Sequence, residues 1–97
     1  GHGVPQNYSE AAKWHRKSAE QGYSAAQLSL ARMHDRGNGV PQNELSAYMW
    51  SNLAANRGLE KAEAYRDVLR QKMTKEQISE AERLSNEWLK KRAKKQK

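Results

Sequence analysis

Small and apolar residues recur along this chain with helical spacing, and the pattern occurs twice. The first set stands at i, i+3, i+4, i+7, i+8 and i+11: Ala11, Trp14, His15, Ser18, Ala19 and Gly22. The second set keeps the same spacings: Ala47, Trp50, Ser51, Ala54, Ala55 and Gly58. A stripe of this kind predicts an amphipathic helix in each copy.

The loop before each stripe is also repeated. Residues 3–7 read Gly-Val-Pro-Gln-Asn, and residues 39–43 repeat them 36 positions later. Asn7 is a favourable N-cap, and Glu10 stands where a capping box places its acidic residue. Gly22 and Gly58 stand where a left-handed residue ends a helix. A period in the thirties predicts a helical solenoid, in which each unit packs on its neighbours.

Three further helices follow from the same reasoning. Residues 25–36 and 61–72 predict the second helix of each unit, with apolar residues at helical spacing. Thr74 and Gln77 form a capping box that opens a fifth helix. The stripe of that helix comprises Ile78, Ala81, Leu84, Ser85, Trp88 and Leu89.

These motifs carry a family resemblance. The order A-x-x-W-x-x-x-A-x-x-x-G, then A-x-x-x-L-A-x-x-H, then G-x-G-V-P-Q-N, resembles the Sel1-like repeat, a relative of the tetratricopeptide repeat. The stretch from Met73 to Ala81 resembles the segment that closes bacterial proteins of this family. The resemblance implies an all-α fold, a right-handed α-α solenoid of about five helices in antiparallel pairs.

The resemblance also suggests how the chain is divided. Residues 1–73 would hold two repeats, 1–36 and 37–73, with the first repeat incomplete at its N-terminus. Residues 74–92 would form a capping helix, because a solenoid needs an end unit with a polar outer face. Residues 93–97 would be a disordered basic tail.

The amino-acid composition limits both the kind of core and the kinds of chemistry that this chain can have. Only 36% of the 97 residues are apolar and none is Phe, which predicts an interior of small side chains. The absence of Cys excludes disulfides and thiolate chemistry. No run of apolar residues is long enough to cross a membrane.

Candidate catalytic and metal-binding residues find little support. His15 and His34 lie on inward stripes without partners at a metal-ligand spacing, so we expect packing roles. We expect Trp14, Trp50 and Trp88 to pack in the core or at its margin rather than to stack on a ligand. The glycine-rich loops lack the Lys-Ser/Thr pair of a phosphate loop. We therefore predict no enzyme, no cofactor and no metal site.

Positive charge is concentrated at one end. Residues 1–89 hold 12 basic and 11 acidic groups, whereas residues 90–97 hold six cations and no acid. The six cations are Lys90, Lys91, Arg92, Lys94, Lys95 and Lys97. They favour either a solvated helix end or, as an alternative function, binding of nucleic acid or an anionic membrane.

The leading hypothesis is a non-catalytic scaffold that binds a peptide or partner protein on a concave repeat surface. By resemblance to tetratricopeptide repeats, the helices beginning near Ala25 and Lys61 would line it. The expected contact residues are Leu28, Arg32, Asp35, Lys61, Ala64 and Val68. The first helix would expose an apolar face, so the chain would self-associate or be marginally stable. The resemblance implies a bacterial adaptor, and the compartment stays open between cytoplasm and periplasm, because both tolerate a chain without Cys.

Overall fold

The computed structural model describes residues 7–95, with the side chain of Lys95 left out, and within this range the chain forms five α-helices and no strand. The helices are α1 (Tyr8–Glu20), α2 (Ser24–Arg36), α3 (Glu44–Asn56), α4 (Glu60–Lys72) and α5 (Lys75–Lys95). α1 and α3 start 36 residues apart, as do α2 and α4, and each of these four helices has 13 residues. The repeat of the sequence is therefore a repeat of structure.

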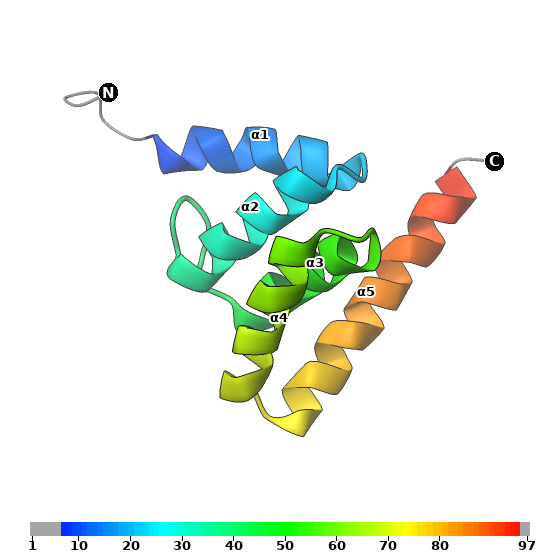
Figure 1. The fold of residues 1–97 in the computed structure, drawn as a ribbon. Helices are drawn as coiled ribbons and strands as arrows, with labels where there is room; N and C mark the ends of the chain where they lie inside the picture. The colour runs from blue at the N-terminus through cyan, green and yellow to red at the C-terminus, as the bar shows by residue number, and fades with distance from the viewer. Residues whose placement is uncertain (1–6, 96–97) are drawn as a thin grey trace.

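The helices form two antiparallel pairs and a long final helix (Figure 1). α1 packs on α2 and α3 packs on α4 within the two pairs, while α2 and α3 form the main contact between them. α5 packs against α3 and rises away from α4 toward the end of α1 (Figure 1). α3 is consequently the central helix. The all-α solenoid expected from the sequence is confirmed.

The turn inside each pair is made in the same way. Gly22 and Gly58 have φ angles of 95° and 94°, in the left-handed region that favours glycine. The N–H of Tyr23 donates to the carbonyl of Ser18 at 3.2 Å, and the N–H of Leu59 donates to that of Ala54 at 3.3 Å. These bonds close the helix ends, as the two glycines predict.

Gly37, in the loop between the two units, has the same left-handed geometry. Its φ is 74°, and it ends α2 with its N–H donating to Met33 O at 2.7 Å. Gly37 and Gly58 are therefore both left-handed helix ends. Any substitution that adds a Cβ is strained at both.

Helix starts follow the predicted capping residues. The side chains of Asn7 and Asn43 accept from the backbone N–H of Glu10 at 3.0 Å and of Ser46 at 3.1 Å. Thr74 and Gln77 form the reciprocal capping box. At α1 the box is incomplete, because the Glu10 carboxylate accepts from the Asn7 side-chain amide at 3.4 Å and not from its backbone.

The interior consists of small residues and a few large ones. Ala19, Ala31, Ala47, Ala54, Ala62 and Ala81 are fully buried. Tyr48, Leu30 and Leu69 are the largest apolar side chains that are fully buried. Alanines let helix axes approach closely, so a chain without Phe still builds a core. Tyr48 and Leu53 were absent from the predicted stripes, although both are buried in α3.

Candidate protein-interaction surfaces

The surface between α2 and α4 is organised by Tyr65. Its hydroxyl donates to the Asp35 carboxylate at 2.5 Å, and the Arg32 guanidinium lies 5.7 Å from the ring centre. Burial, followed by the bond to Asp35, raises the pKa of Tyr65 well above its ordinary value. Lys72 reaches Asp35 from the other side at 3.8 Å. Tyr65 thus stays neutral and fixes the spacing of the two helices.

A shallow hollow lies beside this link, at the N-terminal ends of the two helices. Its lining residues come from both helices and the turn before α4: Ala25, Leu28, Ser29, Arg32, Gly58, Leu59, Glu60 and Lys61. The half-buried Leu59 and the exposed Ala25 form its apolar part, over the buried Leu28, and charged groups stand at its rim. Arg32 and Lys61 are both exposed there. The hollow can therefore offer an apolar contact next to two cations.

The six contact residues predicted from the sequence are distributed unevenly over this surface. Arg32 and Lys61 line the hollow, while Ala64 and Val68 are exposed on α4, Val68 at 53%. Leu28 lines the floor of the hollow but is only 5% exposed, because it packs against Ala54, Ala55 and Ala62. Asp35 is half-buried and engaged by Tyr65 and Lys72.

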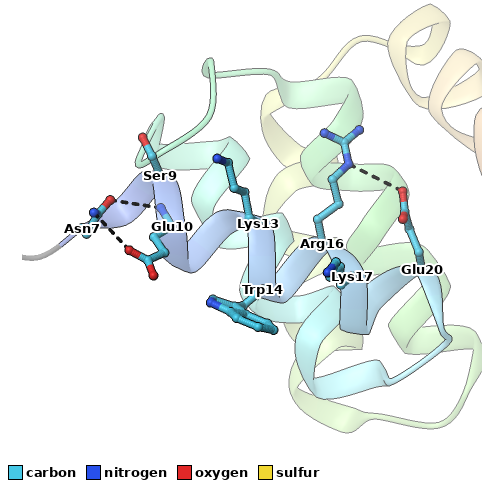
Figure 2. A pocket seen from close by; sticks show the side chains of 8 residues that line it. All are labelled: Asn7, Ser9, Glu10, Lys13, Trp14, Arg16, Lys17 and Glu20. Carbon is cyan, nitrogen blue, oxygen red and sulfur yellow. Dashed lines mark hydrogen bonds and ion pairs between the residues drawn. The ribbon is translucent and has the colours of Figure 1, made fainter.

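The outer face of α1 is a second open surface. Figure 2 shows its side chains: Asn7, Ser9, Glu10, Lys13, Trp14, Arg16, Lys17 and Glu20. Trp14 points away from the neighbouring helices and is 63% exposed, with the Lys17 ammonium 5.5 Å from its ring centre. The expectation that Trp14 lies in or beside the core is therefore wrong. Its counterpart Trp50 is buried by α2, and no described residue occupies the matching place on α1.

The other two tryptophans meet each other, as a core role requires. Trp50 is 4% exposed and packs edge to face on Trp88, with ring centres 5.8 Å apart. Arg92 lies over the ring of Trp88, with its guanidinium 5.6 Å from the ring centre. The predicted core positions of Trp50 and Trp88 agree with this geometry.

The basic end of the chain is only partly a free tail. α5 continues to Lys95, three residues beyond the end expected at 92, and residues 96–97 lie outside the described part, so Lys97 does too. Arg92 donates to the carbonyls of Glu20 at 2.6 Å and Gln21 at 2.5 Å, at the end of α1. It therefore ties α5 to the first pair, and grouping it with the tail was wrong. Among the described side chains here, the exposed cations are Lys90, Lys91 and Lys94.

The sequence does contain a signal for the role of Arg92. Arg92 follows Trp88 by four residues, the spacing that places two side chains on the same face of a helix. A guanidinium over an indole ring is a favourable pair. What this spacing cannot reveal is the third partner, the end of α1, which is 71 residues away along the chain.

His15 and His34 lie apart from any cluster of possible metal ligands among the described residues. Among residues 7–95, no three His, Cys, Asp or Glu side chains come together as a metal site requires. His34 is half-buried, and its Nδ1 lies 3.4 Å from the carbonyl oxygen of Pro41. Burial lowers the pKa of His34; the Pro41 contact opposes this, and the charge of Arg16 adds to it. No helix among residues 7–95 has the length and apolar character to span a bilayer.

Comparisons with known proteins agree with the repeat geometry. The sequence profile of the Sel1 repeat matches residues 1–23 and 24–59, which is more than half of the chain. The chain belongs to the Sel1 repeat family. The resemblance seen in the sequence is thereby confirmed, and proteins with this repeat generally mediate protein–protein interactions.

A solved structure resembles this Sel1-repeat chain along nearly its whole length. It is c5321, a protective antigen present in uropathogenic Escherichia coli strains that displays an SLR fold. The TM-score is 0.85 at 34% sequence identity. The match covers 96% of this chain and 20% of the antigen, so this chain spans about a fifth of the antigen's length. A search of curated proteins finds no match.

Proposed function

We propose that this Sel1-repeat chain is a non-catalytic binding module that holds an acidic, partly apolar peptide segment on its α2–α4 surface. The observation that carries the proposal is the hollow between the two helices, where Leu59 and Ala25 offer apolar surface beside Arg32 and Lys61. A carboxylate on the partner would meet these cations while an apolar side chain entered the hollow. The open residues Ala64 and Val68 extend the surface along α4.

The charge of this surface supports an acidic ligand. Asp35 is held by Tyr65 and Lys72, so its charge is already compensated. Glu60 also stands at the rim and partly offsets Lys61. Arg32 and Lys61 nevertheless flank the apolar part from both helices. Because both groups are exposed, they would contribute more to the rate and specificity of binding than to affinity.

The test begins with a displayed peptide library selected on the 97-residue chain. Selected peptides should combine acidic and apolar residues, and one of them would be titrated into the isotope-labelled chain. We expect amide shifts along α2 and α4, and affinity weakened about tenfold in an Arg32→Glu, Lys61→Glu variant. The matched control reverses Lys90 and Lys91, which lie on α5. Shifts confined to residues 90–97 would refute the proposal and favour the tail.

A further inference from the structure

The contact between α2 and α3 shows how two helix faces of this repeat pack on each other. In the contact between the pairs, Trp50 and Leu53 of α3 pack with Ala26, Leu30 and Ala31 of α2. Each of these residues has a counterpart 36 positions away, in α1 or α4. One of them, Ala62, is fully buried against α2 and α3. The others lie on two helix faces that the described helices leave open or only partly covered. The structure therefore shows both halves of a contact that this chain does not itself make.

The first of these faces is on α1 and the second on α4. On α1 the counterparts of Trp50 and Leu53 are Trp14 and Lys17, both exposed. On α4 the counterpart of Ala31, which is fully buried, is Asp67, whose side chain is 64% exposed. The counterparts of Gln27 and His34 are Glu63 and Arg70, also exposed. α5 leaves this side of α4 open because it packs on α3.

We propose that α1 of one copy of this chain docks on α4 of a second copy, in the way that α3 docks on α2. Since α2 and α3 run antiparallel, residues late in one helix lie near residues early in the other. The N–H of Asn43, for example, donates to His34 O at 2.9 Å. Transferred by the 36-residue repeat, this geometry places Glu10 near Arg70 of the second copy. It also places Lys17 near Glu63.

Charge complementarity supports this pairing over others. Both pairs, Glu10 with Arg70 and Lys17 with Glu63, join opposite charges. A parallel orientation would instead bring Glu10 to Glu63 and Lys17 to Arg70, which are like charges. Trp14 would lie between the two pairs, over the partly exposed side chain of Arg66, the counterpart of Leu30. The Arg66 guanidinium is held in place by its donation to Asn52 at 3.0 Å. The charges of the two faces therefore favour antiparallel docking of α1 on α4 over parallel docking.

The character of the two faces also predicts a weak contact. Lys17 replaces the buried Leu53, and Asp67 replaces the buried Ala31, so polar groups stand where the inner contact is apolar. An interface of one helix on one helix falls in the size range of transient complexes. The contact joins unlike faces, so each added copy leaves one face of each kind open and association continues head to tail.

The test uses sedimentation velocity of the 97-residue chain from about 0.01 to about 1 mM at low salt, a range in which a weak complex dissociates. The wild-type chain should associate as its concentration rises. Lys17→Glu and Glu63→Lys should each weaken association about tenfold, because each places like charges together. Combined in one chain, the two substitutions should restore it. Lys90→Glu, on exposed α5, is the matched control for an altered net charge.

Mixing provides an independent check. An equimolar mixture of the Lys17→Glu and Glu63→Lys chains should associate more strongly than either variant alone, since each α1 face then finds an α4 face of opposite charge. Trp14→Ala should weaken association while leaving the unfolding curve of the dilute chain unchanged. If Glu63→Lys perturbs folding, as circular dichroism would reveal, Glu10→Arg and Arg70→Glu form an equivalent pair.

Three results would overturn the proposal. The first is a wild-type chain that stays monomeric over the whole range. The second is a Glu63→Lys chain that associates as strongly as wild type while Lys17→Glu does not, which would indicate contact between two α1 faces. The third is failure of the combined variant to recover. The Arg32→Glu, Lys61→Glu variant should associate normally, so this test is separable from that of peptide binding.

Discussion

α1 and α3 are equivalent helices with opposite surroundings. They have the same length, the same Asn cap and a tryptophan at the same position, yet two residues of α1 are buried against seven of α3. α3 is enclosed by α2, α4 and α5, whereas α1 packs mainly on α2. The comparison teaches that a repeat motif specifies backbone and capping, while burial depends on the neighbours that each copy has.

The largest expected difference is between the two tryptophans. Trp50→Ala should lower the free energy of unfolding by about 3 to 5 kcal/mol, because the cavity would lie between α2 and α5. Trp14→Ala should change it by less than about 0.5 kcal/mol, since the side chain is largely in solvent. Urea denaturation of the dilute chains measures both.

A loss this large can unfold so small a chain outright. Trp50→Phe is therefore the second variant, with an expected loss of about 1 to 2 kcal/mol. Equal effects of Trp14→Ala and Trp50→Ala would show that the two helices are equally enclosed in solution, and the comparison would fail.

A second difference lies at the ends of the two helices. Gly22 and Gly58 have nearly the same φ, but a Cβ added at Gly22 would come within 3.0 Å of the Arg92 guanidinium, while at Gly58 it would meet nothing within 4 Å. Gly58→Ala should cost about 1 kcal/mol for the left-handed backbone alone. Gly22→Ala should cost about 2 kcal/mol, because Arg92 must also give up its bonds to Glu20 and Gln21.

Unfolding measurements on the Arg92→Ala background separate these two causes. There, Gly22→Ala and Gly58→Ala should cost the same, since no guanidinium remains to be displaced. If Gly22→Ala is still the more costly substitution, the difference does not come from Arg92. Circular dichroism of each variant checks that α5 remains helical.

Sequence reasoning predicted what depends on local chemistry. The helix starts at Asn7, Asn43 and Thr74, the left-handed turns at Gly22 and Gly58, and the 36-residue period all follow from propensities that act within a few residues. It failed where the outcome depends on packing between distant segments. Trp14 satisfies the same helical pattern as Trp50, so no local rule can distinguish them.

The candidate surface was predicted less well for the same reason. Helical periodicity separates Arg32, Lys61, Ala64 and Val68 from the core stripe, and all four are exposed, while their contact with a partner stays a prediction. Leu28 is buried by α3 and α4 together, and the repeat motif carries no signal for that combined contact. The bond between Tyr65 and Asp35 joins residues 30 positions apart and has no local signature.

The smallest expected difference concerns the two N-caps. Asn7 and Asn43 make the same bond, at 3.0 and 3.1 Å, but the first turn of α1 is exposed and can open without uncovering the core. Asn43→Ala should therefore cost about 1 kcal/mol in urea unfolding, and Asn7→Ala about 0.5 kcal/mol. Amide hydrogen exchange should rise in the first turn of α1 in the Asn7→Ala chain and stay unchanged in α3. Equal losses of unfolding free energy from the two substitutions would mean that α1 opens only together with the rest of the chain. In that case α1 would not unfold locally, although few of its residues are buried.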